Sequence, residues 1–200
     1  MQKIAIYGAS GHGKVVAEIA KLAGYADILY LDDGINEYIS FEDFLQKNLQ
    51  IPIAFGIGNN YIRAKLYQKC IAHTLEIKTL IHPSAIISNG ATIAEGTVIM
   101  AGTVINTDTK IGKCAIINTS SVIEHDNIIG DFVHISPQVA CAGDVKIGAY
   151  THVGIGSCII QGISIGSNTI IGAGSVVVKN INNQTLAYGN PCKTIKEISQ

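Results

Sequence analysis

Charged residues are scarce in this chain, and the few present are balanced in sign. Its 200 residues include 14 Lys and Arg against 15 Asp and Glu, a formal net charge of −1. Surfaces that bind nucleic acid carry clustered Lys and Arg, often interleaved with aromatic side chains. The sequence has no basic stripe and no such interleaving, so we expect no nucleic-acid partner.

The cysteines show no pairing pattern. There are five, an odd number, without CxxC or zinc-finger spacing. This usage indicates a reducing compartment rather than a disulfide framework. The chain enters a strand-like segment at Lys3 to Tyr7 without a signal-peptide pattern. We therefore expect a cytoplasmic protein.

Charge disappears altogether between Lys146 and Lys179, where no Asp, Glu, Lys or Arg occurs. Judged by hydropathy alone, such a stretch resembles a membrane span. Glycines and polar residues such as His152, Gln161 and Ser167 interrupt it at a regular spacing. We interpret it as the last part of a repeat and expect no membrane partner. Its uncharged faces could instead be buried against neighbouring subunits.

The repeat has a period of six. An aliphatic residue, with one cysteine among them, stands at every sixth position: Ile81, Ile87, Ile93, Ile99, Ile105, Ile111, Ile117, Ile123, Ile129, Ile135, Cys141, Ile147, Val153, Ile159, Ile165, Ile171 and Val177. A fixed period indicates a repeat architecture, and six fits the alternation of a strand with one turn per unit. Three units would close a triangular coil in which residues n and n+18 stack, about 4.8 Å apart. We therefore expect an all-β parallel helix with these side chains pointing inward.

Small residues surround each inward position. In most units a small or β-branched residue precedes it by two, as in Thr97 and Ser121. Glycine often follows it directly, as in Gly112, Gly130 and Gly148. We expect these glycines to supply the positive φ that a tight corner needs.

The first eighty residues alternate strand-like and helix-like segments. We predict strands at Ile4–Tyr7, Ile28–Leu31 and Ile53–Ile57, a helix at Lys14–Ala23, and two more helices capped by Ser40 and Asn60. Such alternation indicates a small parallel sheet, a Rossmann-like α/β unit. We expect two domains: residues 1–80, which bind a nucleotide-type ligand, and residues 81–200, the β-helix with a short C-terminal tail.

Polar segments follow the three predicted strands. They are the turn Gly8-Ala-Ser-Gly11-His12-Gly13, the pair Asp32 and Asp33, and the pair Asn59 and Asn60. A glycine-rich turn at a helix N-terminus can cradle phosphate with backbone N–H groups. Open parallel sheets bind ligands at the carboxyl ends of their strands, where an acid can bind a ribose hydroxyl. The GxxGxG spacing differs from the GxGxxG of dinucleotide enzymes, and about eighty residues give only half of a full dinucleotide fold, so an NAD(P) site is the weaker interpretation.

Six motifs together resemble one family from end to end. They are GASGHG, the DD pair, IGNN, IHPSA (Ile81 to Ala85), NTSSVIEHD (Asn118 to Asp126) and GNPCK (Gly189 to Lys193). They are similar to bacterial sugar-nucleotide acetyltransferases of the hexapeptide-repeat superfamily, most of all to UDP-4-amino-sugar N-acetyltransferases of the bacillosamine pathway. The resemblance implies a left-handed β-helix, acetyl-CoA lying between subunits of a homotrimer, and a nucleotide sugar on the N-terminal domain. Cys192 departs from the Ala more common there.

His125 is the candidate general base. It lies two residues after the inward Ile123, at an outward corner, between Glu124 and Asp126. A carboxylate on one imidazole nitrogen fixes the tautomer and raises the basicity of the other, and the resemblance favours Asp126 for this role. Gly143, eighteen residues on, should stack on His125, and the resemblance assigns its N–H to the thioester oxygen. No GxSxG-type nucleophile motif occurs, so direct attack is expected.

The resemblance also implies ligand contacts. It places His134 beside acetyl-CoA; Ile155, Ala173 and Gly174 would follow the pantetheine, and Lys179 and Lys193 would approach the CoA phosphates. The nucleotide sugar would contact Gly8, Gly11, His12, Gly13, Asp32, Asp33, Asn59, Asn60 and Asn118. His152, eighteen residues after His134, has no assigned role. The expected co-substrate is acetyl-CoA, without a metal.

Three alternatives stay open. The acceptor could be a sugar hydroxyl, as in sialic acid O-acetyltransferases, because both reactions need the same base. His125, His134 and His152 could hold zinc across a trimer interface, as in carbonic-anhydrase-like β-helices, although such coils need no nucleotide domain. A non-catalytic scaffold is the third. The sequence does not separate UDP from GDP or dTDP substrates.

Overall fold

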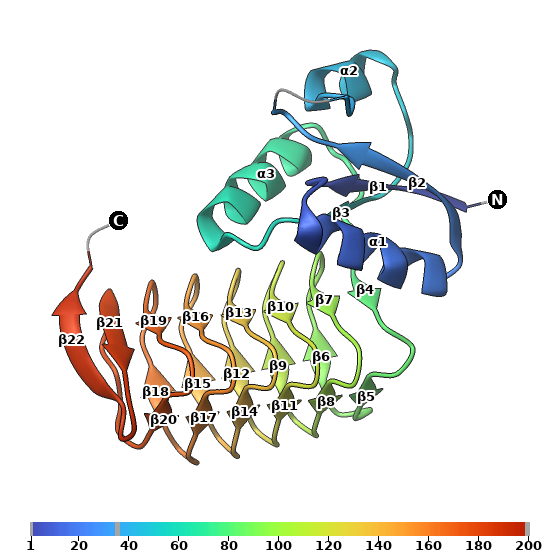
Figure 1. Cartoon of the computed structure of the whole chain (residues 1–200). Helices are drawn as coiled ribbons and strands as arrows, with labels where there is room; N and C mark the ends of the chain where they lie inside the picture. Colours follow the sequence, from blue (N-terminus) through green and yellow to red (C-terminus); the bar gives the residue numbers. More distant parts are fainter. Residues whose placement is uncertain (1, 35–36, 199–200) are drawn as a thin grey trace.

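The computed structural model describes residues 2–34 and 37–198 and shows an α/β unit lying along one side of a parallel β-helix (Figure 1). In the α/β unit the parallel sheet has the order β2-β1-β3, formed by β1 (Gln2–Tyr7), β2 (Tyr25–Leu31) and β3 (Ile53–Phe55). Its helices are α1 (Gly11–Leu22), α2 (Phe41–Gln46) and α3 (Asn60–Ala72). The predicted Rossmann-like architecture is confirmed, whereas the domain boundary at residue 80 stays a prediction.

Two details of this unit test the predicted helix caps. Ser40 does cap α2, because its hydroxyl accepts a hydrogen bond from the backbone N–H of Asp43. The cap of α3 is Asn59 and not Asn60, since the Asn59 side chain accepts from the N–H groups of Tyr61 and Ile62. The prediction of Asn60 as the cap was therefore wrong by one residue.

The β-helix is left-handed and has three flat faces, each built from two-residue strands. Face 1 contains β4 (Leu80–Ile81), β7 (Val98–Ile99), β10 (Ile116–Ile117), β13 (His134–Ile135), β16 (His152–Val153) and β19 (Ile170–Ile171). Face 2 contains β5 (Ile86–Ile87), β8 (Val104–Ile105), β11 (Val122–Ile123), β14 (Ala140–Cys141), β17 (Cys158–Ile159) and β20 (Val176–Val177). Face 3 contains β6 (Thr92–Ile93), β9 (Lys110–Ile111), β12 (Ile128–Ile129), β15 (Lys146–Ile147) and β18 (Ser164–Ile165).

The eighteen-residue register is confirmed. Ile117 pairs with Ile135 and Ile123 pairs with Cys141, each in a parallel ladder. Most inward side chains are fully buried, but Ile81 is 39% exposed because the first coil leaves that end of the helix open. The hydroxyl-bearing residues that stand two positions before an inward residue form hydrogen bonds inside the corner. The Thr97 hydroxyl, for example, donates to the Gly112 carbonyl at 2.8 Å and accepts from the N–H of Ala115. Such hydroxyls join the same corner of successive coils.

The glycines that follow the inward residues do not have the predicted positive φ. Positive φ occurs three residues after the inward position instead, for example at Asp126, Asp144 and Gly162. Gly130 is needed for a different reason, since a Cβ there would stand 2.6 Å from the backbone nitrogen of Ala149 in the next coil. These glycines therefore permit close stacking of coils, and the predicted role in backbone strain was wrong.

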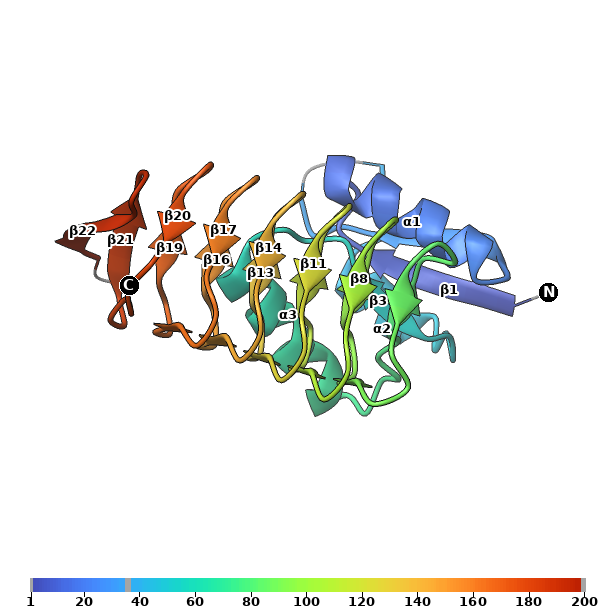
Figure 2. The same ribbon diagram turned by 90° about the horizontal axis from the view of Figure 1, so that it is seen from below.

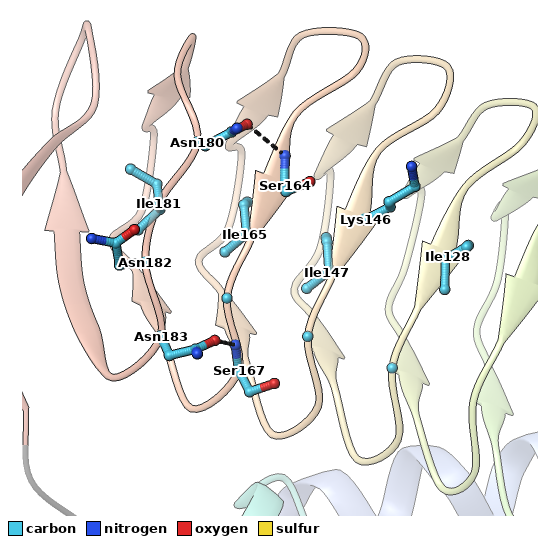
Figure 3. Close-up of a pocket in the computed structure, with 13 residues that line it drawn as sticks. Ile128, Lys146, Ile147, Ser164, Ile165, Ser167, Asn180, Ile181, Asn182 and Asn183 are labelled. Atoms are coloured by element: carbon cyan, nitrogen blue, oxygen red, sulfur yellow. Dashed lines mark hydrogen bonds between the residues drawn. The ribbon is translucent and has the colours of Figure 1, made fainter.

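The C-terminal end of the β-helix is closed by its own chain. The strands β21 (Thr185–Tyr188) and β22 (Lys193–Glu197) extend face 1. On face 3, beyond β18, the ladder continues only as a single backbone bridge between Ile165 and Ile181. On either side of this bridge, the side chains of Asn180 and Asn183 accept hydrogen bonds from the N–H groups of Ser164 and Ser167 (Figure 3), so these N–H groups stay paired.

The α/β unit packs on face 1 (Figures 1 and 2). The core around α1 includes Leu80, Val98 and Ile116 of that face, and the core beside α3 includes Cys114 and Phe132. The ring of His12, at the start of α1, comes to 6.3 Å of the His134 ring. The carboxyl ends of the sheet strands therefore open towards the coil of His134. In the described ranges, no helix combines the length and apolar character that crossing a bilayer requires.

Candidate active site

His125 occupies the corner between faces 2 and 3 and is exposed to solvent. Its Nδ1 lies 2.8 Å from an Asp126 carboxylate oxygen, and this hydrogen bond raises the pKa of His125 above its ordinary value. The Glu124 carboxylate instead accepts from the Asn106 amide at 2.9 Å. Asp126, and not Glu124, is thus the acid in contact with the imidazole. The pairing leaves Nε2 as the nitrogen that can take a proton.

Gly143 lies directly against that imidazole, as the eighteen-residue stacking predicts. An ideal Cβ at Gly143 would stand 2.5 Å from Cε1 and 2.7 Å from Nε2 of His125. Only a glycine leaves room for the ring in this position. A substrate atom beside Nε2 would therefore also lie close to the Gly143 backbone.

A groove with a volume of about 370 Å³ brings together several predicted ligand residues. It runs along face 1 and the corner between faces 1 and 2, and its lining includes Asn118, His134, Ile155 and Ala173, which sequence reasoning selected. Gly174 follows Ala173 directly, whereas Lys179 and Lys193 lie outside the lining. We call this the cofactor groove.

His134 is held in the groove as a neutral imidazole. Its Nδ1 lies 3.3 Å from the Gly58 carbonyl and its Nε2 lies 3.2 Å from the Asn118 amide nitrogen. A carbonyl can only accept, so Nδ1 carries the proton and Nε2 accepts from Asn118. Burial, followed by the neighbouring His152 and then the positive charge of Arg63, lowers the pKa of His134 to about 3.

His152, which sequence reasoning left without a role, lines the same groove. Its ring centroid is 4.7 Å from that of His134, and its Nε2 is 3.0 Å from the Ser136 hydroxyl. Burial lowers its pKa. It also lines a second cavity of about 390 Å³, with Gly58, Asn59 and Tyr61 at the start of α3. The eighteen-residue spacing after His134 was the signal that placed it here.

The glycine-rich turn has a tight interior and an open exterior. Gly8 has φ +110°, and a Cβ on Gly13 would stand 1.9 Å from the Gly8 carbonyl oxygen. By contrast, a Cβ on Gly11 would meet no atom within 4 Å. Ser10 makes no side-chain cap on α1. The first N–H groups of α1 therefore lie at an open surface suited to an anion.

The environment of His12 favours the binding of a ligand at this turn. Its Nε2 is buried and makes no hydrogen bond, and burial lowers its pKa to about 4. A buried polar atom without a partner is costly and commonly marks a functional position. A ligand atom that donates to Nε2 would satisfy it.

The other predicted substrate residues have structural contacts of their own. Asp32 accepts from the N–H groups of Ala9 and Gly34 and so holds the glycine-rich turn. Asp33 accepts from the Tyr7 hydroxyl at 2.5 Å, from the Phe41 N–H and from Lys69. Burial alone would raise its pKa, but these hydrogen bonds hold the pKa of Asp33 below its usual value. Their contacts with substrate stay predictions.

Asn60 joins the two parts of the molecule. Its amide donates to the carbonyls of Tyr150 and Thr151, and its oxygen accepts from Arg63. Arg63 itself, which sequence reasoning missed, is 1% exposed and bridges α3 to the β-helix. Asn59 caps α3 and lines the second cavity. A substrate contact of either asparagine is untested.

A larger cavity of about 600 Å³ lies on face 3, away from these groups (Figure 3). Lys146 is the one ionisable side chain in its lining, beside Ile128, Ser164 and Asn180. Its asparagines serve the closing of the last coil. The described residues also contain no group of three or more His, Cys, Asp or Glu side chains placed to hold a metal ion.

The candidate site residues lie on two different sides of the chain. His125 stands at the corner between faces 2 and 3, whereas His134 lies on face 1, under the α/β unit. In a triangular coil a corner between two faces is opposite the third. His125 of one chain therefore points away from the cofactor groove and glycine-rich turn of the same chain.

The chain is similar to known proteins in its N-terminal part and over longer stretches. Residues 3–70 match the family model described as the PglD N-terminal domain. A segment of 107 residues is 40% identical to UDP-N-acetylbacillosamine N-acetyltransferase of Bacillus subtilis (strain 168). That segment spans 48% of this chain and 50% of the curated relative, so the match covers half of that protein's length.

Solved structures match over nearly the whole chain. One is a histidine-to-asparagine variant of perosamine N-acetyltransferase from Caulobacter crescentus, in complex with CoA and GDP-perosamine, with a TM-score of 0.93, 33% identity and 98% of each chain covered. Another is the acetyltransferase domain of PglB from Neisseria gonorrhoeae, with a TM-score of 0.90, 36% identity, and 98% of this chain and 100% of that chain covered. The latter domain has also been solved with acetyl coenzyme A.

Proposed function

This chain belongs to the hexapeptide-repeat sugar N-acetyltransferases, and from that premise we propose that it acetylates the 4-amino group of a nucleotide-linked amino-dideoxy sugar with acetyl-CoA. The observation that carries the proposal is the match over 98% of both chains to the Caulobacter enzyme that binds CoA and GDP-perosamine. The match to a bacillosamine enzyme favours UDP as the nucleotide. The protein would then act in the cytoplasm in the synthesis of glycan precursors.

The proposed reaction is direct attack. The sugar amine attacks the thioester carbonyl while Nε2 of His125 takes its proton, and Asp126 stabilises the imidazolium through Nδ1. The Gly143 N–H would stabilise the oxyanion of the tetrahedral intermediate. Collapse breaks the carbon–sulfur bond, and the CoA thiolate leaves with the proton from His125. The products are the acetamido sugar and CoA.

A homotrimer supplies the proximity that one chain lacks. The outward side chains of face 2 are all uncharged: Ile86, Val104, Val122, Ala140, Cys158 and Val176. Face 3 by contrast carries Lys110 and Lys146. Three chains packed through face 2 would set the His125 corner of one subunit beside the cofactor groove of the next. Face 2 lies between these two corners, which favours this assembly.

The deciding experiment measures free thiol released from acetyl-CoA with a panel of UDP-, GDP- and dTDP-4-amino sugars and free sialic acid. We expect fast turnover with one nucleotide amino sugar, and the His125→Ala variant serves as the control. Turnover with sialic acid alone would move the assignment to O-acetylation. Thiol release from none of the acceptors would contradict the proposal and call for metal analysis.

A further inference from the structure

Arg63 is a buried cation bonded wholly to neutral oxygens. Its side chain lies at the interface of α3 and the β-helix and is 1% exposed. Nε donates to the Cys114 carbonyl at 2.7 Å, and Nη2 donates to the Asn60 amide oxygen at 2.8 Å. Burial lowers the pKa of Arg63 to about 10, so it stays charged at neutral pH. Each of its acceptors is a carbonyl or amide oxygen, and such a costly arrangement calls for a reason.

The remaining bonds of Arg63 converge on the surroundings of His134. Nη1 donates to the carbonyls of Ile57 and Gly58 at 2.9 and 3.2 Å. Nη2 reaches the carbonyls of Phe132 and Val133 at 3.0 and 3.4 Å. The Gly58 carbonyl is the group that accepts from Nδ1 of His134, and Val133 directly precedes His134. One guanidinium thus fixes both the strand that carries His134 and the loop whose Gly58 carbonyl accepts the hydrogen bond from Nδ1 of His134.

We propose that Arg63 is a positioning residue, which holds His134 in the cofactor groove as a neutral imidazole with its proton on Nδ1 and its lone pair on Nε2. The positive charge acts in the same direction as the hydrogen bonds, because it disfavours a second proton on His134, and also on His12 and His152. A neutral Nε2 can accept from an N–H group of a ligand, whereas an imidazolium cannot. The inference rests on the proposed function only in naming acetyl-CoA as that ligand.

A lysine at position 63 should position His134 poorly. A guanidinium presents five donors in a flat fork, whereas an ammonium presents three from one point and cannot span Cys114, Gly58 and Phe132 together. Arg63→Lys therefore keeps the charge but loosens the loop, and Arg63→Met removes both. Leu80→Ala is the matched control, because Leu80 is buried at the same interface, on the first coil, far along the helix axis from His134.

Two readouts separate positioning from stability. Long-range ¹H–¹⁵N spectra of the imidazoles should show His134 neutral with Nδ1–H in the natural protein, and a mixture of tautomers in Arg63→Met. Calorimetry with acetyl-CoA alone should show Kd raised about tenfold in Arg63→Met, as expected for the loss of one hydrogen bond from the ligand to Nε2, less in Arg63→Lys, and unchanged in Leu80→Ala. With acceptor present, KM for acetyl-CoA should rise while kcat changes little.

Several outcomes would overturn the inference. An Nε2–H tautomer or a charged His134 in the natural protein would contradict it directly. So would an Arg63→Met protein with lower Tm but natural Kd, since Arg63 would then only hold the two parts together. If Arg63→Met does not fold, Arg63→Lys gives the same comparison. The spectra and the calorimetry need no turnover, so failure of the proposed reaction is seen separately in the thiol assay.

Discussion

His125 and Gly143 are stacked one coil apart, so closely that a Cβ on the glycine would stand 2.7 Å from Nε2 of the imidazole. Gly143 is outside the left-handed φ region, so alanine is allowed by its backbone. The close contact alone makes glycine necessary. The nitrogen involved is the one proposed to take the proton, so this contact defines where the acceptor amine can sit.

Gly143→Ala should therefore displace the imidazole without unfolding the protein. We expect kcat/KM to fall about 100-fold, because a displacement of about 1 Å is enough for such a loss. Tm should change little, since His125 is exposed and its ring can swing into solvent. In a His125→Ala background the same substitution should have no further effect on the rate. An additional loss there would show that Gly143 acts independently of His125.

Asp126→Asn should move the pH profile in a defined direction. The hydrogen bond to Asp126 raises the pKa of His125, and the base form exists above that pKa. Removing the carboxylate lowers the pKa, so the acid limb of kcat/KM against pH should shift to lower pH. The plateau should fall about tenfold or more, because a weaker, less oriented base remains. Asparagine tolerates the positive φ of Asp126. An unshifted limb would disprove the assignment.

The β-helix and its register could be predicted because the buried inward residues, from Ile99 to Val177, themselves recur every six positions in the sequence. The His125–Gly143 contact followed from the same period. The sequence alone could not show why residue 130 is a glycine, because a positive φ and a close contact with a neighbouring backbone both favour glycine. Arg63 and Asn60 were missed or misplaced since their partners, such as Thr151 and Phe132, lie far away in sequence. No local sequence pattern indicates which residues of the α/β unit contact the β-helix.

Glycines that follow an inward residue and contact the next coil should respond to substitution differently from glycines that have a positive φ and open space around them. Gly148→Ala should destabilise the protein by about 1–3 kcal/mol, because the new Cβ would stand 2.4 Å from the backbone nitrogen of Ser167. Gly162→Asn should be tolerated, since Gly162 has φ +71° with open space around it, and Asn168 adopts the same conformation. Urea unfolding of both variants measures this. Equal losses would contradict the assignment of Gly148 to packing.

The buried histidines should make stability depend on pH. Burial lowers the pKa of His12 to about 4 and of His134 to about 3. Below about pH 6.5 the unfolded chain binds protons that the native chain does not, so stability present above pH 6.5 is lost as pH falls. For two histidines the loss between about pH 6.5 and pH 5 is on the order of 3 kcal/mol as an upper bound.

Urea unfolding at one protein concentration tests this difference. The double variant His12→Gln, His134→Gln should lose less stability than the natural protein over the same pH range, because glutamine does not titrate. Carboxylates that titrate at lower pH are common to both proteins and cancel in the comparison. The same loss in both would show that these imidazoles are protonated in the native state.

Face 2 should be the surface through which the chains assemble. Val122→Asp would bury a carboxylate at that face and should yield monomers without activity, since an unpaired charge is expensive to bury. Ile128→Asp is the control, because Ile128 is an outward aliphatic on face 3 and is 44% exposed. Light scattering after size exclusion gives the mass of each. A trimeric Val122→Asp, or a monomeric control, would contradict the assignment.

Sharing of the site between subunits predicts complementation. His125→Ala and His134→Ala should each be inactive alone, since one lacks the base and the other disrupts the cofactor groove. In mixed trimers a complete site forms wherever the His125 corner of a His134→Ala chain lies beside the cofactor groove of a His125→Ala chain. For random mixing of equal amounts, about a quarter of the sites would be complete. Recovery near that fraction of natural activity, measured by thiol release, supports sites built from two chains. No recovery, with mixed trimers verified by mass, would place both histidines in a site within one chain and would contradict the division between face 1 and the His125 corner.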